Sequence, residues 1–303
     1  MSTRVQGIVA TAQYPTGTTA LTLALPSPAT PGNMVTLRLT FIDTAASGLV
    51  PIATPSDANG VYETANNIVW YGNGYDGVDS FQGGGAIFYV PNCLTGTHST
   101  TISQLGHLLY IEALLEEWSG IAASPLDQAQ GFFNTTNPST ANTGTTGPLA
   151  QSNELVLGLF FMGSGAGSSN VNISDPPAGW VSDYLDNNTA LEIGAEFCHK
   201  EAGSTAGQIC TWTWNTEPTM IVSGQIIATF KETGSIQPIQ KMYSNGQFFS
   251  THFEEKGTAV TDGRMKLYSN GTTQILNINE IISTRANKLF ANGMFLCNAY
   301  SEF

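Results

Sequence analysis

A short phrase that occurs three times near the C-terminus constrains the folding of this 303-residue chain more than any other feature. The copies are Lys241-Met-Tyr-Ser-Asn-Gly246, Lys266-Leu-Tyr-Ser-Asn-Gly271 and Lys288-Leu-Phe-Ala-Asn-Gly293. Asn-Gly between apolar and aromatic residues favours a two-residue type I′ hairpin turn, because both turn positions need a positive φ. We therefore predict hairpin turns at Asn245-Gly246, Asn270-Gly271 and Asn292-Gly293.

These turns also fix the register of the hairpins, and therefore which residues lie opposite one another. The predicted pairs are Ser244 with Gln247, Tyr243 with Phe248, Met242 with Phe249, Phe290 with Phe295, and Leu289 with Leu296. Aromatic cross-strand pairs stabilise a hairpin by roughly 0.2–1 kcal/mol each. Residues 241–303 are thus predicted to form a module of three β-hairpin repeats without catalytic residues.

Hairpins of this size are marginal in water when isolated, so they must pack on each other, on the rest of the chain or on a partner. A threefold internal repeat is compatible with a pseudo-threefold arrangement or with a homotrimer. A duplicated set of strands that completes a sheet would produce the same pattern. The sequence leaves both interpretations open.

The composition favours strands and argues against two classes of partner. The chain is 41% hydrophobic but only 11% charged, with 32 glycines, whereas an average globular protein is about 25% charged. Its polar surface must come from Thr, Ser, Asn and Gln, which suits strands and turns. A net charge of −13 argues against binding to nucleic acid or to an anionic membrane. The N-terminus lacks the apolar segment of a secretory signal, and no apolar stretch is long enough to span a bilayer.

Residues 1–232 consist largely of short apolar runs separated by Gly- and Pro-containing turns. Many of the runs alternate with a period of two, and they lie at 20–25, 34–42, 86–90, 155–161, 208–214 and 221–230. Regular short strands of this kind predict an all-β sandwich or barrel. Residues 233–240 contain Gly and Pro and are predicted to be a linker.

One segment fits two periodicities. Between 105 and 120, the leucines and Trp118 fit a helical spacing, which predicts a helix. The alternation of Leu109, Ile111, Ala113 and Leu115 also permits a strand.

An ordered set of motifs gives the chain a family resemblance. The set comprises Pro31-Gly32, Gly84–Pro91, Glu116–Ile121 with Ser124–Asp127, and Asn153–Gly158. It resembles a jelly-roll or immunoglobulin-like sandwich domain of tailed-phage virion proteins and bacterial surface proteins, in which the stretch before the Trp-Ser-Gly motif is a strand. The three repeats likewise resemble C-terminal repeats of phage structural proteins. The resemblance implies a jelly-roll-like β-sandwich, but the insertion Asp43–Phe81 departs from its pattern.

The cysteines Cys93, Cys198, Cys210 and Cys297 do not form a disulfide framework. Cys198 and Cys210 lie symmetrically about Ser204, so a hairpin there would permit a disulfide between them. Free buried thiols are the expectation, because nothing in the sequence indicates an oxidising compartment. Structural zinc needs four ligands, usually in paired short spacings, and this pattern is missing. We expect no metal and no cofactor.

The acidic cluster Glu112, Glu116 and Glu117 has two interpretations. Two carboxylates can act as the acid and base of a glycosidase. No second acidic motif accompanies these residues, so we expect them on a solvated strand face or turn. The sequence also contains no nucleophile elbow, phosphate loop or dinucleotide fingerprint. We therefore predict no catalytic residues and expect that the protein is not an enzyme.

A loop rich in glycine and aromatic residues is the candidate ligand or interface site. Its candidate residues are Trp70, Tyr71, Tyr75, Asp76, Asp79 and Phe81. Its aromatic rings could stack on sugars, and its two aspartates could bind hydroxyls or Ca²⁺, because loops often carry binding function. Alternatively, the rings pack back on the sandwich or at a subunit interface, which we favour because large aromatics dominate such contacts.

These observations and the resemblance lead to three functional expectations. The first is a non-enzymatic virion structural protein of a tailed phage, assembled in the host cytoplasm as a capsid decoration, head-fibre or tail-fibre component. Its partners would be other virion proteins and symmetry mates, with a homotrimer expected. The alternative is a carbohydrate-binding adhesin module that recognises a host surface glycan through residues 70–81. The third is a glycan-degrading enzyme built on the sandwich.

Overall fold

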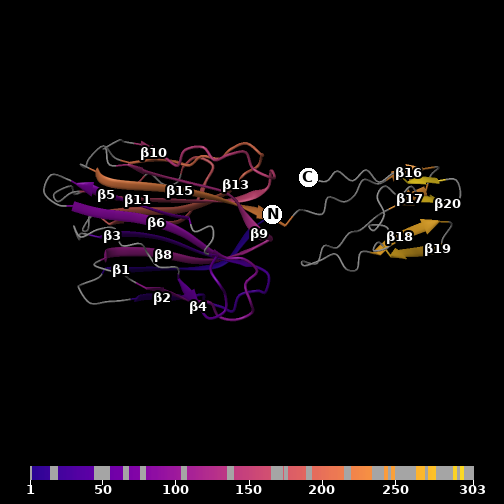
Figure 1. The fold of residues 1–303 in the computed structure, drawn as a ribbon, viewed down its shortest axis with the longest axis horizontal. Coiled ribbons are helices and arrows are strands. Elements are labelled where there is room, and N and C mark those ends of the chain that lie inside the picture. Colours follow the sequence, from indigo (N-terminus) through magenta and orange to yellow (C-terminus); the bar gives the residue numbers. More distant parts are fainter. Residues whose placement is uncertain are drawn as a thin grey trace. The chain divides into compact units, whose positions relative to one another are not determined.

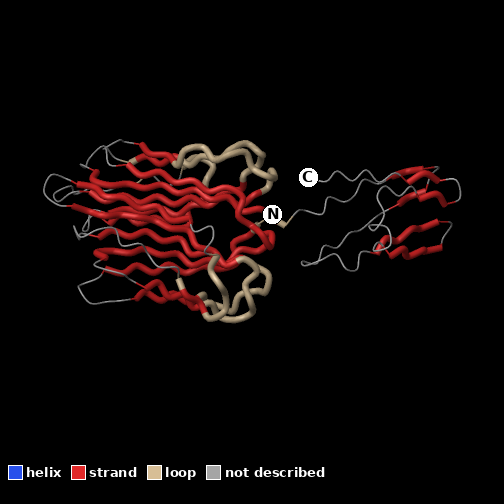
Figure 2. The backbone as a smooth tube through the Cα atoms, in the orientation of Figure 1, coloured by secondary structure: helices blue, strands red, loops and turns tan. Residues whose placement is uncertain are grey.

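The computed structural model divides the chain into two units, Met1–Thr233 and Gly234–Phe303. The described residues of both units are strands, turns and loops, with no helix among them (Figure 2). They are residues 2–13, 20–43, 55–63, 68–75, 80–103, 108–134, 140–164, 173, 177–188, 193–214, 220–233, 242–244, 247–249, 264–269, 272–277, 289–291 and 294–296.

Two five-stranded antiparallel sheets form the centre of the first unit. The first large sheet has the order β1 (Thr3–Gln13), β8 (Leu108–Ser119), β3 (Met34–Asp43), β6 (Ser80–Val90) and β5 (Ile68–Tyr75). The second large sheet has the order β12 (Val181–Asn188), β13 (Ile193–Glu201), β11 (Glu154–Ser164), β15 (Met220–Glu232) and β9 (Ile121–Asn134).

Two smaller antiparallel sheets complete the unit. The first outer sheet has the order β2 (Ala20–Ala24), β7 (Ser99–Ser103) and β4 (Ser56–Asp57). The second outer sheet pairs β10 (Thr140–Asn142) with β14 (Thr211–Thr213). In Figure 1, β2 and β4 lie at the bottom of the unit and β10 lies at its top, with the large sheets between them.

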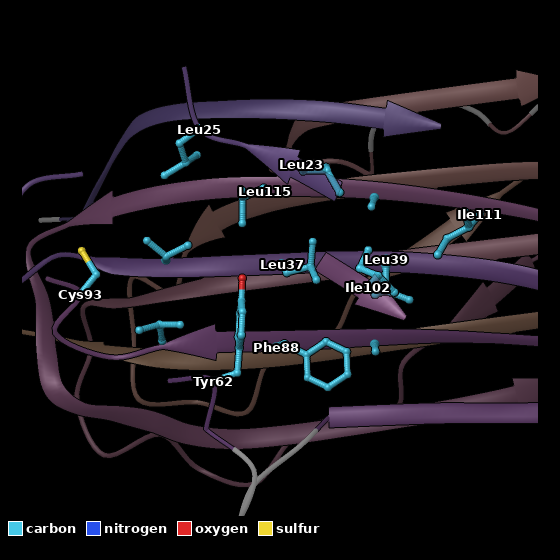
Figure 3. Close-up of a cluster of buried hydrophobic side chains, with 14 of the residues drawn as sticks. Leu23, Leu25, Leu37, Leu39, Tyr62, Phe88, Cys93, Ile102, Ile111 and Leu115 are labelled. Atoms are coloured by element: carbon cyan, nitrogen blue, oxygen red, sulfur yellow. The ribbon is translucent and has the colours of Figure 1, made fainter. Parts of the chain in front are cut away.

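Three hydrophobic cores separate the four layers. Residues of β3 alternate between two of them: Leu37 and Leu39 face the first outer sheet, where they meet Leu23 and Ile102 (Figure 3). Met34, at the start of β3, faces the second large sheet. The third core lies between the second large sheet and the second outer sheet. Both large sheets are therefore covered on both faces, and the predicted all-β sandwich is confirmed in a four-layered form.

The two large sheets have the same strand order. The first runs β1-β8-β3-β6-β5, and the second, read from β9, runs β9-β15-β11-β13-β12. Numbered from β9, the second order is 1-7-3-5-4, which is also the order of the first sheet when β4 is left out of the numbering. In the first half, β1-β8-β3-β6 opposes β2-β7-β4 in a jelly-roll-like arrangement, and β5 extends the large sheet beside β6. In the second half, an isolated β-bridge between Ile173 and Trp214 replaces the pairing of β4 with β7 in the first half. Residues 3–119 and 121–232 are thus two jelly-roll-like halves in tandem, joined at Gly120, whose φ of 76° suits glycine.

The ambiguous segment from 105 to 120 contains strand β8. Its odd-numbered residues Ile111 and Leu115 face the first outer sheet, whereas Leu114 and Trp118 face the second large sheet. A strand that is buried on both faces is apolar at both parities. The apolar residues on the two faces of β8 together produce the spacing that fits a helix in the sequence.

The second unit contains three hairpins. These are β16 (Met242–Ser244) with β17 (Gln247–Phe249), β18 (Arg264–Ser269) with β19 (Thr272–Asn277), and β20 (Leu289–Ala291) with β21 (Met294–Leu296). The pairings of Ser244, Tyr243, Met242, Phe290 and Leu289 are those predicted from the turns. The turn residues themselves, Asn245, Gly246, Asn270, Gly271, Asn292 and Gly293, lie outside the described residues.

Thr233 closes the first unit. Its backbone N–H donates to the carbonyl oxygen of Gly120 at 2.9 Å, and its hydroxyl approaches the same oxygen. Of the predicted linker 233–240, the remaining residues lie outside the described part.

Candidate functional site

The residues predicted to form an aromatic loop lie largely in strands: Trp70, Tyr71 and Tyr75 are on β5, the edge strand of the first large sheet, and Phe81 is on β6. In the ladder, Trp70 lies opposite Gly85, Tyr71 opposite Gly84, and Tyr75 opposite Ser80. Phe81 lies on β6 opposite Gly74. Asp76 and Asp79 lie outside the described residues, as do the side chains of the four aromatic residues. The backbone thus brings both ends of the loop together.

A buried ionic cluster between the two large sheets is the most polar site in the described structure. At its centre is Arg38 on β3, whose side chain is fully buried. Its Nε and Nη2 donate to Glu116 Oε2 at 2.9 and 2.6 Å, and Nη2 also donates to Asp183 Oδ2 at 2.7 Å. Its Nη1 donates to the carbonyl oxygens of Gly158 and Cys198 at 3.2 and 2.8 Å. All five guanidinium donors therefore have an acceptor.

Arg4 and His199 form the side of the cluster that reaches solvent. Arg4 contacts Glu116 Oε1 through Nε at 3.0 Å and Asp183 Oδ1 through Nη1 at 3.1 Å. His199 Nδ1 lies 2.8 Å from Asp183 Oδ1, and its ring meets the edge of Trp118. The Arg4 and His199 side chains are 29% and 22% exposed, whereas those of Arg38, Glu116 and Asp183 are almost fully buried. The cluster is therefore enclosed except at one edge.

The charges of the cluster stabilise one another. Burial would lower the pKa of Arg38, but Glu116 and Asp183 raise it above its usual value. Burial would raise the pKa of Asp183, but Arg38 and His199 hold it below its usual value. Burial raises the pKa of Glu116 despite the opposing effect of Arg38. The Arg38–Asp183 pair remains ionised, and it links the first half of the unit to the second.

The predicted location of the acidic cluster on a solvated face is wrong. Glu112, Glu116 and Glu117 are all buried, because both faces of β8 are covered by other layers. Glu117 accepts from Thr30 N, Asn33 Nδ2 and Gln6 Nε2 at 2.8, 2.6 and 2.6 Å. Burial would raise its pKa, but these hydrogen bonds lower it. Glu117 therefore fixes the turn before β3.

Glu112 has a different environment from its two neighbours. Thr40 Oγ1 lies 3.4 Å from Glu112 Oε2, and Tyr110 donates its hydroxyl to the nearby Asp186 at 3.0 Å. Burial, followed by the interaction with Asp186, raises the pKa of Glu112 well above its usual value. Glu112 is a buried carboxyl that favours its protonated form.

A second buried polar cluster lies beside the first outer sheet. His98 Nδ1 is 3.3 Å from Asp57 Oδ2, which also accepts from Thr100 Oγ1 at 2.9 Å. The Tyr62 and Thr100 hydroxyls are 2.7 Å apart. Burial would lower the pKa of His98, but Asp57 and Cys93 raise it to about 10. The nearby Asp57 carboxylate thus favours the cationic form of His98.

An aspartate, a histidine and a cysteine in one cluster could act as a nucleophilic triad. Here, however, His98 is 0% exposed and Cys93 is 2% exposed. The Cys93 thiol donates to the carbonyl oxygen of Thr30 at 3.3 Å. This arrangement holds the chain around β4 and β7 and presents no thiol to solvent.

Sequence reasoning missed Arg38, Asp183 and His199 as partners of Glu116. One signal was available, because Arg38 interrupts an apolar run between Leu37 and Leu39. Its partners come from β8 and β12, which lie far away in the sequence. Within the described part, no group of three or more His, Cys, Asp and Glu side chains could hold a metal ion.

No protein-family model, no curated protein and no solved structure matches this chain. Among the described residues there is also no helix long and apolar enough to cross a membrane.

Proposed function

We propose that this protein is a non-enzymatic virion structural component that acts through protein–protein assembly. The observation that supports the proposal is the tandem pair of jelly-roll-like halves, because jelly rolls form the domains of many viral capsid proteins. Each large sheet is covered on both faces, so the first unit is suited to serve as a rigid body.

The buried polar clusters are consistent with this role. The acids and bases that would be candidates for chemistry, Arg38, Glu116, Asp57 and His98, are enclosed and bound to one another. Their contacts connect layers and halves of the unit. Such a network stabilises an architecture, whereas a general acid or base must reach a substrate.

The hairpin module supplies the means of assembly. Two-stranded hairpins are marginal alone, and their unpaired edges are available to other strands. Three such hairpins in sequence favour a homotrimer or another symmetric assembly on the particle. The component would be a capsid decoration, a head fibre or a tail fibre, assembled in the host cytoplasm with other virion proteins.

Deleting residues 241–303 tests this proposal. We expect the truncated protein to lose the oligomeric state of the full chain in light scattering, while residues 1–233 retain their cooperative melting transition. An unchanged oligomer after deletion would refute assembly through the hairpin module. Mass spectrometry of purified particles would test the virion location directly.

A carbohydrate-binding adhesin is the second candidate, because jelly rolls also form lectin domains. Its binding site would be the β5–β6 hairpin, with Trp70 and Tyr75 on β5 and Asp76 and Asp79 in the following residues. If the rings bind glycan, Trp70→Ala and Tyr75→Ala should abolish binding on a glycan array without changing the melting temperature. If the rings pack instead, the same changes should cost about 3–5 kcal/mol of stability and leave any binding intact.

A further inference from the structure

Two thiols from different layers meet in the second half of the first unit. Cys198 lies on β13 of the second large sheet, and Cys210 directly precedes β14 of the second outer sheet. Their sulfur atoms are 3.8 Å apart, and both residues are 0% exposed. A disulfide bond is about 2.05 Å long, so the two sulfur atoms have less than about 2 Å to close.

The surrounding backbone holds both cysteines in place. Cys210 donates its N–H to Thr143 Oγ1 at 3.1 Å, and its carbonyl oxygen accepts from Thr143 N at 3.0 Å. Cys198 is paired with Gly158 in the middle of the second large sheet. A Cβ at Gly158 would lie 2.9 Å from Cys198 Sγ, so the glycine leaves the space that the sulfur occupies.

The first half has no thiol pair at the corresponding place. There, Leu25 N donates to the carbonyl oxygen of His98, as Thr143 N donates to that of Cys210. The first half thus has His98 at the position before β7, where it pairs with Asp57 of β4 in the same outer sheet, whereas the second half has Cys210 before β14, paired with Cys198 of the large sheet. Among the described residues, the second outer sheet has two strands, whereas the first has three. A covalent connection would add most to the smaller sheet.

We infer that Cys198 and Cys210 form a disulfide latch between the second outer sheet and the second large sheet when the protein meets a small-molecule disulfide such as oxidised glutathione. One protein thiolate attacks the oxidant and releases one glutathione thiol. The second protein thiolate then attacks the mixed disulfide and releases the other. The two cysteines lose two electrons and two protons, which the oxidant receives as it becomes two thiols.

The environment also determines how the latch reacts. Burial raises the pKa of the Cys210 thiol, so few thiolates are present in the closed structure. The Lys200 ammonium, which lies 4.7 Å from the Trp180 ring centre, interacts favourably with thiolate at Cys210 and Cys198. Oxidation should therefore be slow in the closed structure and faster when the outer sheet opens. The latch does not depend on the proposed role in a virion.

The test uses full-length protein with Cys93→Ser and Cys297→Ser, which leaves only the candidate pair. After incubation with oxidised glutathione in mild denaturant and removal of both, we expect a mass lower by two hydrogen atoms and a cross-linked peptide joining Cys198 to Cys210. The melting temperature should rise by roughly 6–12 °C, as for a disulfide closing a short loop in a domain of this size.

Adding Cys198→Ser to this variant provides the matched control, which should acquire no intramolecular cross-link and no increase in melting temperature. If the cross-linked peptide forms in the parent chain as well, the two serine substitutions are not its cause. Stable glutathione adducts at both cysteines, disulfides only between chains, or two free thiols after the oxidation would each overturn the inference.

Discussion

The two halves of the first unit share a strand order but fill it with different chemistry. On the corresponding strand pairs, the first half has Thr40 of β3 opposite Glu112 of β8, and the second has Phe161 of β11 opposite Gly224 of β15. Outside its large sheet, the first half has an ion pair, and the second stacks Phe160 on Trp212 and Trp214 with ring centres 5.3 and 5.4 Å apart. The same topology thus accepts polar or aromatic interiors, provided that buried polar groups find partners.

The location of each cluster determines how far its effect extends. The Arg38 network includes Glu116 from the first half and Asp183 and His199 from the second, so it acts between the halves. The Asp57–His98 pair and the Trp212 stack each lie within one half. Loss of the network should weaken the association of the halves, whereas loss of either outer cluster should act locally.

Arg38→Met should give the largest effect. It leaves Glu116 and Asp183 buried without their main cation, and breaking a buried ion pair in this way costs about 3–5 kcal/mol. We expect the upper end of this range in urea unfolding, because one cation serves two carboxylates. Arg4→Met is the control, since the partial exposure of Arg4 should reduce its effect. Equal losses for both variants would contradict a central role for Arg38.

Trp212→Ala should destabilise the protein by about 3 kcal/mol, the lower end for such changes. The cost depends on how far the surroundings collapse into the cavity, and a two-stranded outer sheet can relax more than a large sheet. Hydrogen exchange should increase in β10 and β14 and remain unchanged in β2 and β7. Exchange that increases equally in both outer sheets would show that the two halves are not independent.

Much of the fold could be predicted from the sequence, because strand periodicity and Asn-Gly turns are local signals. The registers of β16–β17 and β20–β21 follow from two residues each. The shared strand order of the two halves could not be predicted from these local signals. Residue pairs on corresponding strands, such as Thr40–Glu112 and Phe161–Gly224, do not resemble each other.

The buried carboxylates were mispredicted for a related reason. A charged residue every fourth position on a strand normally indicates a solvated face, and Glu112 and Glu116 have this spacing. However, β8 also has Leu114 and Trp118 on the same face as these glutamates, and large apolar residues there indicate a face that is covered. The partners Arg38 and Asp183 depend on tertiary packing between strands far apart in the sequence.

The Asp57–His98 pair predicts that alkaline pH weakens the first half selectively. The pKa of His98 is raised to about 10 in the folded state, so its contribution is present in full below about 6.5 and is lost as the pH rises toward 10. Hydrogen bonds to charged groups contribute about 1.5–3 kcal/mol, and we expect a loss of about 2 kcal/mol. Urea unfolding from pH 7 to 10 measures this loss of stability, and the His98→Gln variant should not show it. If the parent and His98→Gln lose stability in parallel, His98 is not the titrating group.

The smallest expected effect is a gain in stability from Glu112→Gln. The side chains that face Glu112 are Thr40, Tyr110, Tyr184 and Asp186, none of which is a cation. Because the pKa of Glu112 is raised in the folded state, its protonated carboxyl contributes fully to folding stability below about pH 4.5. This contribution is lost as the pH rises through the folded-state pKa. Gln keeps the shape and can donate to Asp186 without binding a proton, so it should stabilise the protein by about 1 kcal/mol at pH 8 and leave it unchanged at pH 4. Urea unfolding at both pH values measures the difference.

Glu116→Gln is the contrasting variant, because it removes the charge that Arg38 needs and should destabilise the protein at pH 8. If Glu112→Gln also destabilises at pH 8, then Glu112 acts as a charged partner, and the first half uses both of its inward-facing glutamates in the same way.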